Sequence, residues 1–351
     1  MKEILSAHAV EALLNWYRGN RRDLPWRHTK DPYRIWISEI MLQQTRVEAV
    51  KPYYARFLES CPDVYALAEL PEDRLMKLWE GLGYYSRARN LQKAARKVVE
   101  EMGGEMPRTY EGLLALPGIG EYTAGAVASI AYDLPVPAVD GNVLRVLSRV
   151  SGSYADITNP ETKALYRKLL PAVIPVAAGD FTQSLIELGA TVCVPNGEAR
   201  CAECPLAEVC VARRQGLTDE LPVRAAKKAR RVEKKTVLLI RDGDRTALRK
   251  RPPKGLLAGL FELPNLEGHL SADELPALIR DFGFEPLHLE RIEDAKHIFT
   301  HIEWHMIAYS VRIAPEFDGW HAGSGMLLVP NGELHADYAI PSAFSAYVKY
   351  L

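Results

Sequence analysis

The chain has 351 residues, of which 48% are hydrophobic and 25% are charged, and its formal net charge is −1. These values are ordinary for a soluble globular protein, and the length predicts two or three domains. No apolar run approaches the length of a membrane span, and residues 1–14 have no signal-peptide core, so we expect an intracellular protein. The net charge does not by itself indicate a nucleic-acid partner, so a surface for one would have to come from local clustering of charge.

The first two predicted helices lie on either side of a basic, aromatic segment. Residues 6–17 have the apolar period of a helix, and residues 21–27 (RRDLPWR) mix cations with a tryptophan. A second helix is predicted over residues 33–44 (YRIWISEIMLQQ), where Glu39 is the single carboxylate among hydrophobic residues. Because such surroundings disfavour the anion, the pKa of Glu39 should rise, as a general acid at neutral pH requires. The pattern alone also fits a partly exposed glutamate at a helix edge.

Further helices are predicted over residues 47–58, 64–70 and 75–80. A glycine-rich turn follows them, GLGYYSR at residues 81–87, before a basic helix. Leu82 and the two tyrosines are expected to protrude from this turn. Such side chains either pack in a core or act as wedges between bases.

Residues 110–142 predict a helix-hairpin-helix that leads to an aspartate. Helices over 110–115 and 121–132 flank the turn LPGIG, in which glycines allow positive φ. The unpaired N–H groups at the start of the second helix favour a phosphate oxygen and read no base. Two prolines then enforce an extended run to Asp140, which should cap a third helix. Taken alone, these features also fit an ordinary helical turn and an ordinary N-cap.

Four of the five cysteines form a run with the spacing Cys-x7-Cys-x2-Cys-x5-Cys, namely Cys193, Cys201, Cys204 and Cys210. Four thiolates so close in sequence suit a tetrahedral zinc ion or a cubane iron–sulfur cluster, and composition does not separate the two. Cys61 lies outside the run and is expected to be a buried thiol.

The composition changes after the cysteines. Residues 213–235 are rich in Lys and Arg and predict a linker, which either is a solvated tether or follows a phosphate backbone. From residue 236 the apolar pattern has period two, as in a domain that contains a sheet. Strands are predicted over residues 236–240, 260–264, 301–311 and 326–329, and helices over residues 272–282 and 341–350.

Several motifs together resemble one enzyme family. LPGIG with Asp140, the segment SEIMLQQTRVEAVKPYY (residues 38–54) and RPPKGLLAGLFELP (residues 251–264) are similar to adenine DNA glycosylases of the MutY type. The resemblance implies a mainly α, two-lobed helix-hairpin-helix glycosylase core with an iron–sulfur cluster loop, followed by an α+β Nudix-like C-terminal domain. The implied domains are residues 1–22 and 133–216 (cluster domain), 23–132 (six-helix barrel domain with the hairpin), 217–234 (basic linker) and 235–351 (Nudix-like domain for 8-oxoguanine).

The resemblance implies a monofunctional DNA glycosylase of base excision repair, which hydrolyses the N-glycosidic bond of adenine mispaired with 8-oxoguanine or guanine. In the family, the position of Glu39 donates a proton to adenine and that of Asp140 stabilises or attacks the sugar cation, while Tyr122 and Asn142 match residues that assist. The residues expected to bind DNA or the flipped base are Arg22, Trp26, Arg27, Gln43, Gln44, Thr45, Leu82, Tyr84, Ser86, Gly118, Gly120 and Gln183.

The family also suggests a cofactor and a lesion reader. Its cysteine run binds one four-iron, four-sulfur (4Fe-4S) cluster, although here one residue more than usual separates the first two cysteines. The helix predicted over 272–282 lacks the glutamate cluster of a working Nudix hydrolase, so we expect that domain to recognise rather than hydrolyse. Phe299, Thr300 and His301 match a Phe-Ser-His triplet that reads 8-oxoguanine. The bare pattern also fits an ordinary strand.

Two other functions fit parts of the sequence. An endonuclease III-like glycosylase and AP lyase on oxidised pyrimidines would need a lysine amine at the position of Tyr122 to form a Schiff base. A non-catalytic helix-hairpin-helix DNA-binding protein would not need both Glu39 and Asp140. We therefore expect a monomeric enzyme that binds double-stranded DNA with an A:8-oxoguanine or A:G mispair, without a membrane partner, in the bacterial cytosol and nucleoid.

Overall fold

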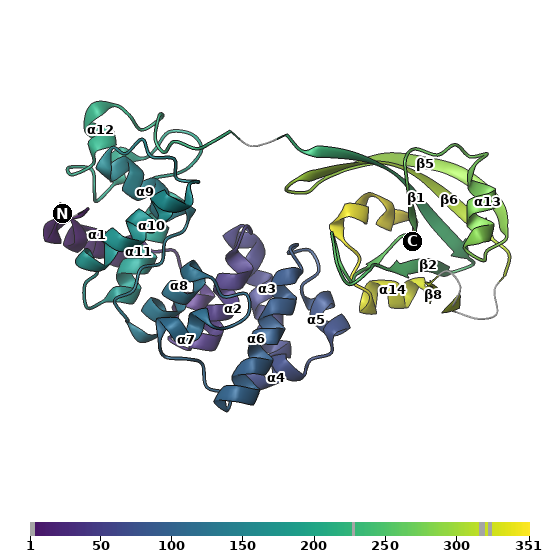
Figure 1. The fold of residues 1–351 in the computed structure, drawn as a ribbon, viewed down its shortest axis with the longest axis horizontal. Coiled ribbons are helices and arrows are strands. Elements are labelled where there is room, and N and C mark those ends of the chain that lie inside the picture. Colours follow the sequence, from purple (N-terminus) through teal and green to yellow (C-terminus); the bar gives the residue numbers. More distant parts are fainter. Residues whose placement is uncertain (1–3, 227–228, 316–319, 322–324) are drawn as a thin grey trace. The chain divides into compact units, whose positions relative to one another are not determined.

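The computed structural model of the chain describes residues 4–226, 229–315, 320–321 and 325–351 (Figure 1). These residues form two compact units. The helical unit comprises the residues up to 69 together with 89–226, and the sheet unit comprises 70–88 together with the residues from 227 onward. Among the described residues, no helix is both long enough and apolar enough to cross a membrane.

Short helices build the helical unit. In chain order they are α1 (Ala7–Asn20), η1 (Pro25–Arg27), α2 (Pro32–Leu42), α3 (Val47–Ser60), α4 (Val64–Glu69), α6 (Ser86–Met102, whose first residues belong to the sheet unit), α7 (Tyr110–Leu114), α8 (Glu121–Tyr132), α9 (Gly141–Ser151), α10 (Pro160–Leu169), η2 (Leu170–Val173), α11 (Ala178–Thr191), η3 (Cys201–Glu203) and α12 (Val211–Gln215). The helices predicted over residues 6–17, 47–58, 110–115 and 121–132 are confirmed to within one turn.

Helices α8 and α11 connect the other helices of this unit. Helix α8 contacts α2 and α7, and α11 contacts α1, α8 and α9. Buried side chains join α1, α9 and α11 in one hydrophobic core, which includes Leu13, Leu147 and Leu185. Helices α2, α8, α9 and α11 thereby surround one region of the unit, and the candidate site lies there.

Glycines let backbone segments approach α8 closely, as its content of small residues predicts. A Cβ atom at Gly125 would lie 2.1 Å from the carbonyl oxygen of Pro137, and a Cβ atom at Gly179 of α11 would lie 2.9 Å from the carbonyl oxygen of Ser129. Side chains do not make contacts this short, so only glycine fits at Gly125 without a shift of the backbone. The extended run that ends at Asp140 therefore lies directly against α8.

The described residues of the sheet unit form one sheet of eight strands. Its elements are α5 (Glu72–Leu78), β1 (Arg231–Asp242), β2 (Arg245–Lys250), β3 (Phe261–Glu262), β4 (Asn265–Glu267), α13 (Leu275–Asp281), β5 (Pro286–Ile298), β6 (Ile302–Ile313), β7 (Trp320–His321), β8 (Met326–Pro330), α14 (Asn331–Asp337) and η4 (Ser342–Tyr350). The strand order is β5-β6-β1-β2-β8-β7, with β3 paired to β2 and β4 to β1. Strands β1 and β6 are parallel and the other pairs are antiparallel.

Each face of this sheet carries its own hydrophobic core. Val237 and Leu239 of β1 pack on one face with buried residues of α14 and η4. Leu238 and Ile240 pack on the other face with Ile279 of α13. Successive side chains of a strand point to opposite faces, so the unbroken apolar run of β1 serves both cores.

Several predictions for this unit need correction. Strand β1 begins at Arg231, inside the predicted linker 217–234, of which residues 227–228 lie outside the described residues. Strands β2 and β5 and helix α14 were not predicted, because charged residues interrupt their apolar pattern. The last predicted helix, 341–350, is present as a 3-10 helix.

The Phe299-Thr300-His301 triplet forms the turn between β5 and β6. Strand β5 ends at Ile298 and β6 begins at Ile302, and the N–H of Phe299 donates to the carbonyl oxygen of Ile302 at 2.8 Å. The alternative prediction, an ordinary strand over the triplet, is therefore wrong. The predicted strand over residues 301–311 is confirmed from its second residue onward.

Replacement of Gly125 by alanine tests the close contact between α8 and the run before Asp140. We expect Gly125→Ala to lower the free energy of unfolding by about 1–3 kcal/mol, because the new methyl group overlaps the carbonyl of Pro137. Urea unfolding measures this loss. Gly19→Ala is the matched control, because a Cβ at Gly19 in α1 meets nothing within 4 Å. Equal stability of the Gly125 variant and the wild type would contradict the contact.

Candidate active site

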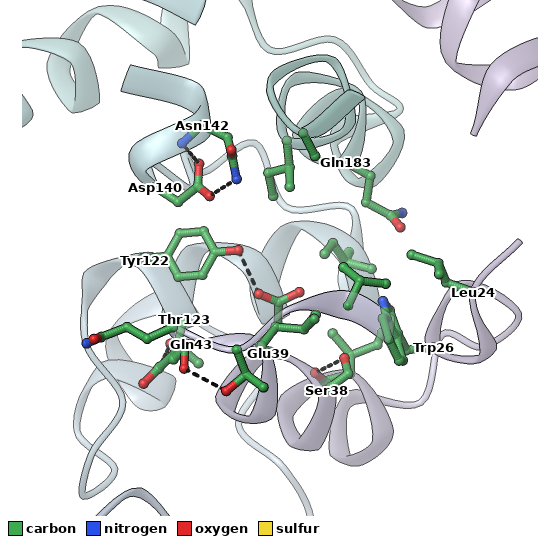
Figure 2. Close-up of a pocket in the computed structure, with 18 of the residues that line it drawn as sticks. Leu24, Trp26, Ser38, Glu39, Gln43, Tyr122, Thr123, Asp140, Asn142 and Gln183 are labelled. Carbon is green, nitrogen blue, oxygen red and sulfur yellow. Dashed lines mark hydrogen bonds between the residues drawn. The ribbon is translucent and has the colours of Figure 1, made fainter. Parts of the chain in front are cut away.

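A cavity of about 700 Å³ lies within the helical unit (Figure 2). Side chains from α2, α8, α9 and α11 and from the segment around η1 line it. The predicted site residues that it brings together are Arg22, Trp26, Arg27, Glu39, Gln43, Gln44, Thr45, Gly118, Gly120, Tyr122, Asp140, Asn142 and Gln183. All predicted catalytic residues thus share one cavity.

Glu39 is a buried carboxyl group at the cavity wall, 7% exposed. The hydroxyl of Tyr122 donates a hydrogen bond of 2.7 Å to its Oε2 atom. Burial raises the pKa of Glu39 to about 7; the charge of Asp140 also raises it, whereas the Tyr122 hydrogen bond and the charge of Arg27 oppose the rise. The expected rise in this pKa is confirmed. Near neutral pH, Glu39 can therefore hold a proton and release it.

Asp140 caps α9, as predicted, and its oxygens accept hydrogen bonds from both backbone and side chain. Oδ1 accepts from the N–H groups of Asn142 and Val143 at 2.9 and 2.8 Å, and Oδ2 accepts from the Asn142 side-chain amide at 2.7 Å. Burial raises the pKa of Asp140, and these hydrogen bonds oppose the rise. In Figure 2, the side chain of Tyr122 lies between the carboxyl groups of Glu39 and Asp140.

Arg145 orients Asn142, a role that the sequence analysis missed. Its guanidinium donates to Asn142 Oδ1 at 2.8 Å, and to the carbonyl oxygens of Gly189 and Cys193 at 2.7 Å each. Because the amide oxygen of Asn142 accepts from Arg145, its NH₂ group points at Asp140. The available signal was an arginine three residues after Asn142, among the apolar positions of α9.

Glu187 is a second missed residue, and it holds two predicted DNA-binding arginines. Its buried carboxylate accepts from Arg22 Nε and from an Nη of Arg22, both at 2.8 Å, and from Arg27 at 2.6 Å. Burial alone would raise the pKa of Glu187, but these hydrogen bonds lower it to about 2. The two guanidiniums therefore form a fixed wall of the cavity. In the sequence, Glu187 lies among the apolar residues Leu185, Ile186 and Leu188, a signal similar to the one that indicated Glu39.

The hairpin and the end of α2 complete the cavity. The predicted helix over 33–44 ends early, at Leu42, and Gln44 has a positive φ of 58°. The Gln43 side-chain amide donates to Thr123 Oγ1 of α8 at 3.2 Å. Gly118 has a φ of 75°, and a Cβ there would lie 2.5 Å from Cβ of Asn90 in α6, so the hairpin requires glycine at this position.

The other predicted DNA-binding residues lie in the sheet unit. The expectation that Leu82 protrudes is wrong: Leu82 and Tyr85 are buried, whereas Tyr84 is 44% exposed. The turn folds back because its glycines have positive φ and the Arg87 guanidinium binds the carbonyl oxygen of Leu82 at 2.9 Å. The hydroxyl groups of Tyr84 and Thr300 lie 2.5 Å apart.

Three further predicted residues occupy the ends of elements in this unit. Ser86 begins α6. The ring of Phe299 packs edge-on against Trp304, with the ring centres 5.0 Å apart. The carbonyl oxygen of His301 accepts from the N–H of Arg231 at 3.0 Å, so the start of β1 holds the triplet turn.

The four cysteines of the run line one small cavity of the helical unit. In the described part of the chain, no three His, Cys, Asp or Glu side chains are placed as ligands of a single metal ion. The cysteines instead surround a volume whose other lining residues are apolar, apart from Thr218, Arg149 and Arg213, and none is acidic. Arg149 also donates to Cys193 Sγ at 3.2 Å. Soft sulfur donors with adjacent cations fit a thiolate-bound zinc ion or iron–sulfur cluster and disfavour a hard cation such as magnesium.

Known proteins resemble both parts of the chain. Residues 37–172 match the HhH-GPD superfamily base excision DNA repair protein model, and residues 236–350 match the NUDIX domain model. The adenine DNA glycosylase of Mus musculus is 37% identical over 86% of this chain and 70% of the mouse enzyme. That of Buchnera aphidicola subsp. Schizaphis graminum is 32% identical over 87% of each. The chain belongs to the adenine DNA glycosylase family. Members of this family are hydrolases of N-glycosyl bonds.

Other comparisons confirm the predicted fold of this family member. The human adenine DNA glycosylase is 36% identical over 83% of the chain, which spans 64% of the human enzyme. Among solved structures, a thermostable thymine-DNA glycosylase matches 59% of the chain and 95% of its own length, with a TM-score of 0.54 and 33% identity. Endonuclease III from a non-covalent DNA complex matches 61% of the chain and 99% of its own length at 24% identity, with a TM-score of 0.51, and shows the fold alone.

The raised pKa of Glu39 predicts how stability depends on pH. A carboxyl group with a folded-state pKa of about 7 and an ordinary value of 4.5 costs stability as pH rises between these values. We therefore compare the free energy of unfolding of Glu39→Gln with that of the wild type at pH 4.5 and at pH 8.5. The difference should shift in favour of the variant by about 2–3 kcal/mol between these pH values. Urea unfolding at both pH values measures the difference, with the exposed Glu100→Gln as control. A difference that does not change with pH would contradict the pKa.

Proposed function

We propose that this family member is a monofunctional glycosylase that removes adenine mispaired with 8-oxoguanine or guanine. One observation carries the proposal: a buried carboxyl group able to hold a proton, Glu39, shares a cavity with a helix-capping carboxyl group, Asp140. Base removal needs these two groups, one to protonate the leaving base and one to stabilise the sugar cation. The target base must first leave the stack, at a cost of about a few kcal/mol.

In the first step, Glu39 donates its proton to the imidazole-ring nitrogen of adenine as the bond between the sugar C1′ and the base nitrogen breaks. The bonding electrons leave with the protonated base, and the sugar becomes an oxocarbenium-like cation. Such an acid is worth about 10²–10⁴ in rate. Tyr122 donates to Glu39 and so holds the carboxyl group in place.

In the second step, Asp140 stabilises the cation as an anion or bonds to C1′, and water then completes the hydrolysis. Three donors support the anionic form: the N–H groups of Asn142 and Val143, and the Asn142 amide. Water adds to C1′, which breaks any bond to Asp140, and the proton that the water loses restores the acid form of Glu39.

Tyr122 supports a reaction without strand cleavage. A lyase forms a Schiff base between an amine and the sugar, and a phenol cannot do this. Burial and the nearby carboxyl groups of Glu39 and Asp140 raise the pKa of Tyr122, so the phenol remains a proton donor. The product should therefore be an intact strand with an abasic site.

Cys193, Cys201, Cys204 and Cys210 would hold one 4Fe-4S cluster. When bound, such a cluster supplies a rigid cross-link between segments of the chain, and no step of the reaction passes through it. The four thiols line one cavity without an acidic neighbour, which supports this assignment. The extra residue between the first two cysteines lies in the segment 194–200.

The sheet unit would read the base opposite the target through Thr300 and His301. 8-Oxoguanine carries a proton on a major-groove ring nitrogen where guanine has none, so an acceptor such as Thr300 Oγ1 could discriminate by about 1–3 kcal/mol. The position of Thr300 at the tip of the β5–β6 turn supports this role. Because a single chain supplies the whole catalytic cavity, we propose that a monomer acts on double-stranded DNA, in the bacterial cytosol and nucleoid.

Excision assays on defined duplexes test the proposal. Adenine opposite 8-oxoguanine or guanine should be removed, and adenine opposite thymine should not. Strands should break only after alkali. Asp140→Asn should slow single-turnover excision by about 10²–10³-fold or more, since it removes the charge but keeps the helix cap, while mismatch binding persists. Wild-type excision by this variant, or a borohydride-trapped adduct that needs one lysine, would contradict the mechanism.

Metal analysis tests the cluster. The purified protein should be brown and contain about four iron atoms per chain. Cys204→Ser should lose most of this iron. One zinc ion per chain without colour would show that the cysteines bind a single ion instead.

A further inference from the structure

Residues 70–88 pack with the C-terminal part of the chain although the helical unit flanks them in sequence on both sides. The chain leaves the helical unit at Glu69, forms α5 and the glycine-rich turn, and returns at Arg89. Helix α5 contacts α14 of the sheet unit. This segment therefore joins the turn that contains Tyr84 to the domain that carries Thr300.

Two side chains at the end of this segment bind backbone groups of the loop after α14. Glu80 Oε1 accepts from the N–H of Ile340 at 2.8 Å. Lys77 Nζ donates to the carbonyl oxygen of Tyr338 at 3.1 Å and to Glu80 Oε2 at 2.6 Å. Both side chains are largely buried, with 20% of Lys77 and 30% of Glu80 exposed. The Lys77–Glu80 ion pair thus binds one backbone N–H group and one backbone carbonyl oxygen of the loop.

Two neighbouring ion pairs are more exposed to solvent than the Glu80 contact. Arg74 with Asp337 and Lys250 with Asp73 form ion pairs at 3.3 Å whose side chains are about half exposed or more, and solvent screens such pairs. The Glu80 contact is better shielded and uses a charge-assisted hydrogen bond, which is stronger than a neutral one. Of these contacts, Glu80 is also the one adjacent to Gly81, where the turn begins.

The turn itself has a defined shape. Gly81, Gly83 and Tyr84 have φ values of 93°, 69° and 47°. Trp79 Nε1 and the Arg87 guanidinium both donate to the carbonyl oxygen of Gly83, at 3.1 and 3.0 Å. A turn held so closely by its own residues moves as one piece. The contact at Glu80 links the start of this turn to the loop after α14.

We propose that Glu80, together with Lys77, is a positioning residue that fixes the turn of residues 81–86 beside the lesion-reading turn of residues 299–301. The hydroxyl groups of Tyr84 and Thr300 lie 2.5 Å apart. A small shift of the turn would therefore change the position of the Thr300 hydroxyl, which is proposed to read the lesion. The inference rests on the proposed function. It adds that discrimination between 8-oxoguanine and guanine depends on Glu80, whose carboxylate binds the loop after α14.

Single-turnover excision of adenine opposite 8-oxoguanine and opposite guanine tests this. Glu80→Ala should lower the ratio of the two rates by about tenfold, while the rate opposite guanine stays close to that of the wild type. Lys77→Ala should lower the ratio in the same direction. Asp73→Ala, in the same helix and in an exposed ion pair, is the control and should keep the wild-type ratio.

A second variant separates positioning from general destabilisation. Thr300→Ala removes the reading hydroxyl, so Glu80→Ala should lower the ratio little further in a chain that already carries Thr300→Ala. Equal slowing on both duplexes, an unchanged ratio, or additive losses in the double variant would overturn the inference. If Glu80→Ala does not fold, Glu80→Gln replaces it, with a smaller loss of the ratio expected and an unchanged ratio overturning the inference.

The rates of the wild-type chain separate a failure of the proposed lesion reading from a failure of the positioning role of Glu80. A wild-type chain that excises adenine equally fast opposite both bases would contradict the proposed lesion reading. A wild-type preference that survives in the Glu80 and Lys77 variants would contradict only the positioning role.

Discussion

The burial of two carboxyl groups in one cavity is the constraint on which the rest of the site depends. Two neighbouring anions in a medium of low polarity are costly, so one group keeps its proton more readily than it would in water. The surroundings decide which. Glu39 has apolar neighbours and one phenol donor, whereas Asp140 receives three donors at the start of α9. The same chemical group can thus serve as acid at one position and as counter-charge at the other.

Close packing of backbones makes this arrangement possible. The run before Asp140 rests on Gly125 of α8, and a Cβ at Gly189 of α11 would lie 2.6 Å from Cβ of Asn142. Asp140 and its partner Asn142 are therefore held by contacts with main chain on two sides. Arg145 adds hydrogen bonds to the same region. The cap keeps its place by steric exclusion as well as by polar contacts.

The sequence predicted those parts of the site that depend on residues close to one another in the chain. The surroundings of Glu39 follow from residues within one helical turn, and the capping role of Asp140 from the residues that follow it. Glu187 was missed because its partner Arg22 lies 165 positions away, and no local pattern shows which distant groups meet. The burial of Leu82 was mispredicted for a related reason, since exposure depends on how a turn folds back. The tight turn at residues 299–301 could not be predicted either, because charged residues hide the length of strand β5 in the sequence.

The carboxylate of Glu187 has a consequence for how the cavity responds to acidity. With a pKa of about 2, it stays ionised at any pH where the protein would be studied, and it forms ion pairs with Arg22 and Arg27. That wall of the cavity therefore presents the same electrostatic surface from mildly acidic to mildly alkaline solution. Glu39, with a pKa of about 7, changes its charge near neutrality in the same cavity. A cavity built in this way combines a wall of constant charge with a carboxyl group that exchanges its proton near neutrality.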